Sequence, residues 1–155
     1  MQLSSSDYSI PQASPSQGGV SSSEMTVKNY KVGAEIDGSA TLFNNQSVMT
    51  PFIIQAVVPD PDNLRDGYVT APAEITNWVT FNTGSTVLID PNSKVTVNII
   101  FKIPSDYKTS LPKNWQFDIV VNPQISTPIS NDNSTSSVQV NIQTKYSFRW
   151  LVSMR

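Results

Sequence analysis

The sequence contains no cysteine and no histidine. Without cysteine there can be no disulfide framework, no thiolate metal site and no cysteine nucleophile. Without histidine the chain lacks the commonest general base and the commonest zinc ligand. These two absences argue against catalysis, so we predict a protein that is not an enzyme and that carries no cofactor.

Charge is also scarce. Lys, Arg, Asp and Glu make up 14% of the 155 residues, and the net charge is -2, whereas about 25% charged residues is usual. Such a surface has no basic stripe for nucleic acid. No apolar run approaches the roughly 18 residues of a membrane span. We therefore expect a protein partner, with carbohydrate as a second candidate, and neither nucleic acid nor a membrane span.

The neutral, polar composition suits a virion or an extracellular, cell-surface location. Met1 is followed by "QLSSSDYSIPQ", which has neither the basic nor the apolar region of a signal peptide. We expect either that the chain works where it is made or that a leader has been removed.

Ser, Pro, Gln and Gly dominate residues 1–23, a composition typical of a flexible arm. We predict an extended N-terminal arm over residues 1–23 and one β-sandwich domain over residues 24–155, a length typical of a single domain. If the arm is ordered, it must be held by its own domain or by a neighbouring copy. Tyr8 and Ile10 are its candidate contact residues.

From Glu24 onward, apolar and polar residues alternate with a period of two, as in half-buried strands. The clearest strands are expected at residues 93–104 and 114–123. Their predicted inner faces are Val95, Val97, Ile99, Phe101 and Ile103 in the first, and Trp115, Phe117, Ile119 and Val121 in the second.

Further strands are expected at residues 25–36, 48–58, 73–81 and 85–90, and no stretch shows convincing helical periodicity. Asp37-Gly38 predicts a hairpin turn between segment 25–36 and the stretch "SATLF" at residues 39–43. Short strands separated by Pro and Gly turns indicate an all-β protein: an Ig-like or jelly-roll antiparallel β-sandwich of seven to nine strands. Trp78 and Trp115 are expected in its core.

Residues 138–152 alternate over an unusual length for one strand. In one interpretation this is a long last strand that packs in its own core. In the other, its later half lays Tyr146, Phe148 and Trp150 on another subunit, since aromatics with an interleaved Arg are typical of interfaces. Alternation alone does not say which surface buries these residues, and we favour the first interpretation.

Other candidate sites are weaker. Asp60, Asp62 and Asp66 could offer oxygens to a calcium ion, but Leu64 and Ala71 stand where an EF-hand needs ligands, so ordinary turn chemistry is favoured. The three Glu residues show no pairing of the kind that glycoside hydrolysis requires. The remaining candidates are the glycosylation acceptors Asn45 and Asn133 and the sugar-stacking aromatics Tyr68, Trp78, Tyr107 and Trp115.

Residues 78–123 resemble an Ig-like β-sandwich module of bacterial and archaeal surface proteins. In that pattern a tryptophan precedes a Pro-x-Ser turn, which opens a strand of alternating Val and Ile that ends in Ile-Pro. The matching positions after Trp78 are Pro91, Ser93, Val95, Val97, Ile99, Ile103 and Pro104. The resemblance implies a shared construction rather than a shared activity. Similar sandwiches also serve as decoration or accessory proteins on tailed-virus capsids and tails.

Two functions follow as hypotheses. The first is a non-catalytic structural protein that acts through protein–protein contacts in a larger assembly, such as a virion decoration or accessory component of a capsid or tail. The alternative is a secreted cell-surface Ig-like module that binds polysaccharide or another surface protein.

Overall fold

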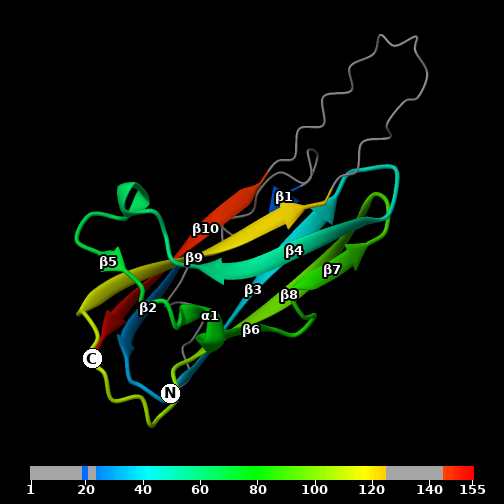
Figure 1. Ribbon diagram of the computed structural model, residues 1–155. Helices are drawn as coiled ribbons and strands as arrows, with labels where there is room; N and C mark the ends of the chain where they lie inside the picture. The colour runs from blue at the N-terminus through cyan, green and yellow to red at the C-terminus, as the bar shows by residue number, and fades with distance from the viewer. Residues whose placement is uncertain (1–18, 21–23, 125–144) are drawn as a thin grey trace.

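A computed structural model describes residues 19–20, 24–124 and 145–155, and these form a sandwich of two β-sheets (Figure 1). The prediction of an all-β sandwich is confirmed. The strands are β1 (Gly19–Val20), β2 (Glu24–Tyr30), β3 (Glu35–Asn44), β4 (Thr50–Val57), β5 (Val69–Thr70), β6 (Val79–Phe81), β7 (Thr86–Ile89), β8 (Ser93–Lys102), β9 (Asn114–Pro123) and β10 (Tyr146–Met154). Within the described part of the chain, eight of them have three or more residues.

The four-stranded sheet has the order β1-β3-β8-β6, and the six-stranded sheet has the order β2-β10-β9-β4-β7, with β5 added beside β9. The chain passes repeatedly from one sheet to the other, so that most described strands are followed along the sequence by a strand of the opposite sheet. Two pairings are parallel, β2 with β10 and β5 with β9, which the predicted antiparallel sandwich did not include. The parallel pairing of β2 with β10 joins the two ends of the domain, with most of the chain as the connection that such pairing requires.

The inner faces of β8 and β9 are those predicted from the alternation. Their nine residues are buried except for Val95, which is partly buried, and the four on β9 are 0% exposed. Phe101 on β8 lies 4.9 Å from Tyr30 and 5.4 Å from Phe117, measured between ring centroids. Aromatic packing across the sheets therefore forms the centre of the core, and the predicted core residues Trp78 and Trp115 are part of it.

Asp37-Gly38 does not form the predicted hairpin. Both residues lie inside β3, which pairs with β8 over its whole length from Glu35 to Asn44. A Cβ atom on Gly38 would lie 2.8 Å from Cζ2 of Trp150, so the glycine is needed because an indole ring crosses this point. The chain reverses instead at residues 31–34, where Gly33 has a φ of 98°, a conformation that glycine adopts easily.

The stretch 73–81, expected to be a strand, begins with one helical turn, α1 (Ile75–Trp78), before β6. Ile75 and Trp78 are both buried, and their spacing of three residues places them on the same side of that turn. A short 3-10 turn, η3 (Pro61–Asn63), lies between β4 and β5. In the described residues no helix is long and apolar enough to cross a membrane.

The C-terminal strand packs in its own core, as in the first of the two interpretations. Phe148, Trp150 and Val152 are 2%, 1% and 0% exposed, while Tyr146 is partly buried. The side chains of Phe148 and Trp150 therefore face the opposite sheet and not a surface that another subunit could reach. Residues 138–144 of the predicted ribbon lie outside the described residues.

Candidate functional site

The outer face of the four-stranded sheet is polar. The alternate residues of β3 that point outward are Glu35, Asp37, Ser39, Thr41 and Phe43. Across from them on β8, Thr96 has its Oγ1 atom 3.0 Å from Oγ1 of Thr41. Lys102 is the cross-strand neighbour of Glu35. Polar cross-strand pairs of this kind suit a surface that faces water.

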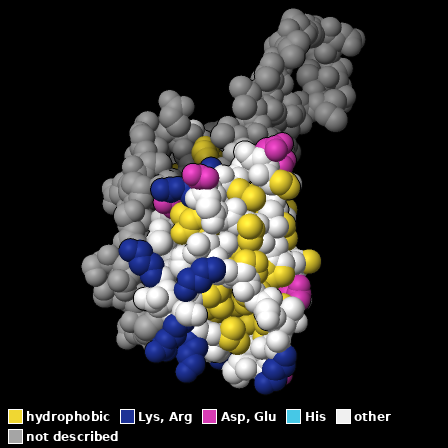
Figure 2. Space-filling model, turned by 90° about the vertical axis from the view of Figure 1, so that its left-hand side faces the viewer, with side chains coloured by type: hydrophobic (Ala, Val, Ile, Leu, Met, Phe, Trp, Pro, Cys, Tyr) yellow, Lys and Arg dark blue, Asp and Glu magenta, His cyan; other side chains and the backbone are white. Residues whose placement is uncertain are grey.

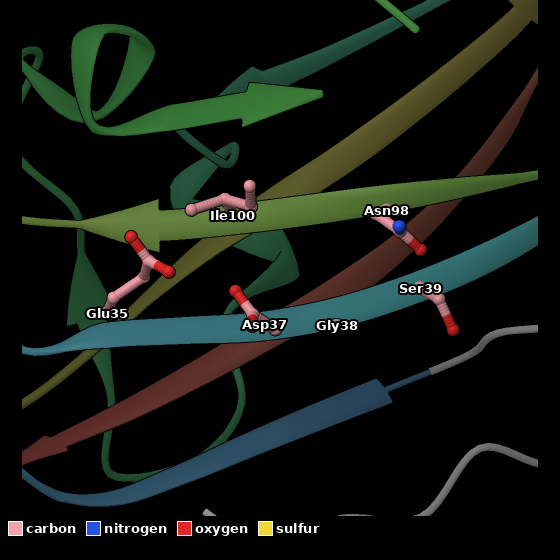
Figure 3. Close-up of a pocket in the computed structure, with 6 residues that line it drawn as sticks. All are labelled: Glu35, Asp37, Gly38, Ser39, Asn98 and Ile100. Atoms are coloured by element: carbon pink, nitrogen blue, oxygen red, sulfur yellow. The ribbon is translucent and has the colours of Figure 1, made fainter. Parts of the chain in front are cut away.

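A shallow hollow of about 340 Å³ lies on this polar face. Figure 3 shows Glu35, Asp37 and Ser39 on β3 beside Asn98 and Ile100 on the neighbouring β8. The described residues contain no group of three or more His, Cys, Asp or Glu side chains that could hold a metal ion. The two carboxylates of the hollow thus stand without the ligands that would make it a metal centre.

The outer face of the six-stranded sheet differs, because aliphatic side chains follow its strands. We call the following set the aliphatic stripe: Pro51, Ile53 and Val57 on β4, Leu88 on β7 and Val120 on β9. Leu88, which is 62% exposed, lies opposite Pro51. Since β4 also buries Phe52, Ile54 and Ala56 on its inner face, this strand is apolar on both sides except at the exposed Gln55.

Exposed hydrophobic residues continue beyond the stripe. Val48 and Met49, directly before β4, are 63% and 54% exposed. The space-filling view in Figure 2 shows hydrophobic side chains gathered in a band on one face of the molecule, with Lys and Arg side chains beside and below it. Contiguous apolar surface of this kind usually marks a contact site.

Beside the stripe, the same outer face is covered by the chain between β4 and β5. Gln116 of β9 is 0% exposed although it points away from the core. Its Oε1 accepts a hydrogen bond from the Arg65 backbone N–H (2.8 Å), and its Nε2 donates to the Asn63 carbonyl (3.2 Å) and to Asp118 Oδ1 (3.0 Å). One buried amide thus fixes the β4–β5 connection to the sheet. We call this connection, residues 58–68, the covering loop.

Charged groups border this buried amide. Asp118 is 9% exposed, and burial raises the pKa of its carboxyl group, while the hydrogen bond from Gln116 and the charge of Arg149 act in the opposite direction. At the rim, Nη1 of Arg65 lies 2.9 Å from Oε2 of Glu24, an ion pair that joins the covering loop to β2.

The predicted site residues do not come together. Asp60, Asp62 and Asp66 are exposed on the covering loop, and Oδ1 of Asp60 accepts from the Asp62 N–H at 3.0 Å. This is the turn chemistry that the sequence favoured over a calcium site. Asn45 is exposed after β3. Tyr8, Ile10 and Asn133 lie outside the described residues.

The four candidate sugar-stacking aromatics differ in burial. Trp78 and Trp115 are buried, and Tyr107, which is partly buried, packs edge-on against Trp78 and donates from its hydroxyl to Glu74 at 3.1 Å. Tyr68, directly before β5, is also partly buried. Because two of the four aromatics are buried, the four do not form a common sugar-stacking surface.

Sequence reasoning missed the aliphatic stripe and Gln116. The stripe has a sequence signal, since "PFIIQAVV" is apolar at consecutive positions, and so at positions on both faces of a strand. Gln116 has none, because it occupies a position that the alternation marks as outward and polar. Its burial depends on the covering loop, which is far from it in the sequence.

No protein-family model matches the sequence, and no curated protein sequence matches it significantly. Solved structures do match in fold. A PapD-like domain of human CEP192 has a TM-score of 0.56 at 10% identity, covering 92% of this chain and 89% of that one. The class 5 fimbrial chaperone CfaA has a TM-score of 0.53 at 9% identity, covering 89% and 57%. The CsuC–CsuE chaperone–tip adhesion subunit complex of Acinetobacter baumannii has a TM-score of 0.52 at 13% identity, also covering 89% and 57%.

These similarities show the fold alone, because the identities are far too low to carry an activity. The chain spans just over half the length of the chaperone chains it matches. A family 123 glycoside hydrolase of Clostridium perfringens also matches with a TM-score of 0.50, but over only 23% of that enzyme's chain. The likeness is therefore to one part of a larger protein.

Proposed function

We propose that this protein is a non-catalytic structural module that assembles with further copies of itself through the aliphatic stripe. The observation that carries the proposal is the outer face of the six-stranded sheet, where β4, β7 and β9 place aliphatic side chains toward solvent. Burying such side chains contributes about 25 cal/mol per Å². A neighbouring copy that covers the stripe is therefore stabilising.

The side-chain chemistry of the described residues supports the same function. Glu24 is paired with Arg65, Glu74 accepts from Tyr107, and Glu35 lies on the polar face. No pair of these carboxylates converges on a common point. A PapD-like domain and fimbrial chaperones share the fold, and one of the matching chaperones is seen in complex with an adhesion subunit. In its most specific version, the proposal is that the protein is a decoration or accessory component of a virion lattice.

The cell-surface alternative, in which the protein binds polysaccharide, has less support. Two of its four candidate aromatics, Trp78 and Trp115, are 5% and 0% exposed and cannot stack on a sugar ring. The other two candidates, Tyr68 and Tyr107, are partly buried.

Sedimentation of the purified full chain tests the proposal. The wild type should form oligomers, and Leu88→Lys should shift it toward monomer. At dilutions where both are monomeric, the two should have the same thermal midpoint, because Leu88 is 62% exposed and contributes little to the core. Thr96→Lys, at an exposed position on the other sheet, is the matched control and should sediment like the wild type. A wild type that stays monomeric at every concentration, or oligomers that persist equally in Leu88→Lys, would contradict the proposed contact.

A further inference from the structure

Strand β4 is flanked by β9 on one side, but on its other side a neighbouring strand covers only part of its length. Strand β9 pairs with it from Phe52 to Val57, but β7 pairs with it only from Thr50 to Ile53. On the side of β7, residues 54–57 of β4 therefore have no strand beside them in the described part of the chain.

The backbone of β4 points hydrogen-bonding groups toward this open side. The N–H of Ile54 donates to the Ser85 carbonyl at 2.8 Å, on the side of β7. Backbone groups of alternate residues in a strand point to the same side, so the N–H and the carbonyl of Ala56 point that way too. The described residues supply neither group of Ala56 with a backbone partner on this side. An edge with such groups is a template for another strand.

A groove of about 540 Å³ runs beside this edge. Its lining residues come from β4, α1, β6 and the connection between β6 and β7. Figure 1 shows α1 and β6 below β4. The lining residues used below are Ile54, Ala56, Val79, Thr80, Phe81 and Ser85, and the others are likewise uncharged. The groove therefore offers apolar walls and hydroxyl groups beside a strand edge.

The outer edge of the same sheet, on β2, is built differently. Asn29 there has a φ of 54°, and the pairing of β2 with β10 shifts register between Val152 and Met154. Lys28 is exposed on this strand. Bulges and edge lysines are devices that prevent a further strand from pairing. At residues 54–57 of β4 there is neither a bulge nor a charge.

We infer that this groove binds an extended, uncharged segment of a partner protein, which adds a strand beside residues 54–57 of β4. Four residues of strand span about 13 Å, and the backbone groups of Ala56 and the carbonyl of Ile54 pair with the added segment. The segment must be uncharged because a charge placed against Phe81 and Val79 would lose its water without gaining a partner. Main-chain pairing with side-chain pockets is a recurring mode of peptide recognition. The inference goes beyond the proposed function, because the groove and the aliphatic stripe can be altered by separate variants.

A display library of random nine-residue peptides tests the inference. The library is selected on the full-length wild type and then depleted on Thr80→Arg, which places a charged side chain at the rim of the groove. The retained peptides should be uncharged, rich in β-branched residues at alternate positions and without a central proline. A retained peptide, made synthetically, should shift and protect the Ala56 amide and should bind Thr80→Arg at least about tenfold more weakly.

Two further variants control this experiment. Ser85→Arg alters the exposed connection and should weaken the peptide as Thr80→Arg does, which covers the case in which Thr80→Arg fails to fold. Thr96→Arg, on the polar face of the other sheet, should bind the peptide like the wild type, with thermal midpoints confirming that each variant is folded.

Three results would overturn the inference: no peptide retained, retained peptides that are charged or proline-rich, or binding that is insensitive to both groove variants. A wild-type oligomer that Thr80→Arg dissociates would also overturn it, since the occupant would then be a second copy. The Leu88→Lys variant separates this outcome from failure of the proposed function, because it alters the stripe and leaves the groove intact.

Discussion

The two sheets share one core but differ on their outer faces. On the four-stranded sheet, β3 and β8 pair in unbroken register over ten residues and turn threonines, acids and lysines outward. On the six-stranded sheet, aliphatic residues follow β4, β7 and β9, and the covering loop buries Gln116 and Asp118. The outer face of the four-stranded sheet is thus suited to contact with water alone. The outer face of the six-stranded sheet is partly covered by the covering loop, and the rest of it exposes the aliphatic stripe.

The difference shows that period-two alternation specifies only the inner side of each strand. The alternation places the same kind of residue toward the core in both sheets, and the core is continuous across them. What an outward position meets depends on what lies above the sheet. A polar residue there can be a solvated side chain, as Thr96 is, or a buried structural group, as Gln116 is.

The largest expected effect comes from removing the buried outward amide. Gln116→Ala leaves the Arg65 N–H, the Asn63 carbonyl and the Asp118 carboxyl without their shared partner. We expect a loss of about 3 kcal/mol in the free energy of unfolding, because each buried polar group left unpaired costs about 1–3 kcal/mol. Thr96→Ala on the polar face should cost less than about 1 kcal/mol. Urea unfolding of both variants measures the difference.

Hydrogen exchange gives this first prediction a second readout. In Gln116→Ala the Arg65 amide should exchange much faster than in the wild type, since the covering loop is no longer fixed to β9. Equal losses of stability in Gln116→Ala and Thr96→Ala would mean that the two outer faces are energetically alike, contrary to the comparison.

A smaller effect is expected where the comparison is made within one strand. Gly38 points inward from β3 and Ser39 points outward. Gly38→Ala should cost about 2 kcal/mol, since overpacking a core typically costs about 1–3 kcal/mol and the new Cβ would lie 2.8 Å from Trp150. In an open strand the same change would stabilise by about 0.5–1 kcal/mol, so the sign of the effect is informative. Ser39→Ala should change stability by less than about 0.5 kcal/mol.

The double variant Gly38→Ala/Trp150→Phe identifies the cause. The smaller phenyl ring makes room for the new methyl group, so the two changes should cost less together than the sum of their separate costs. Trp150→Phe also removes an indole N–H that is buried without a hydrogen-bond partner among the described residues. Strictly additive costs, measured by thermal or urea unfolding, would show that Gly38 is required for another reason.

Most of the fold could be predicted from the sequence, because burial on one face imposes alternation on each long strand. β8 and β9 were predicted with their inner faces correct. The prediction at Asp37-Gly38 was wrong because the sequence does not distinguish a glycine that makes room for a neighbouring side chain from a glycine that allows the backbone conformation of a turn. The spacing of Ile75 and Trp78 was a weak sign of one helical turn inside a predicted strand.

The surfaces were predicted less well, because they depend on pairing between distant segments. The open edge of β4 exists because β7 is shorter than β4, and neither strand alone reveals it. The burial of Phe148 and Trp150 follows from the partners of β10, which are β9 on one side and β2 on the other. Aromatic alternation in that strand was compatible with its own core and with another subunit, and the register decided between them.

The smallest predicted effect concerns the pH dependence of the covered face. Burial raises the pKa of Asp118 in the folded protein above its ordinary value, so the folded state holds this proton more tightly than the unfolded state. The stabilisation is present below the unfolded pKa of about 3.9 and is lost as the pH rises through the folded pKa. Asp118→Asn keeps an acceptor for Gln116 but cannot ionise. Urea unfolding between acidic and neutral pH should therefore show the wild type losing stability relative to Asp118→Asn as the pH rises. Arg149→Gln, which removes the nearby positive charge, should enlarge that loss. If the difference in the free energy of unfolding from Asp118→Asn did not change with pH, either for the wild type or for Arg149→Gln, Asp118 would be solvated like the acids of the other face.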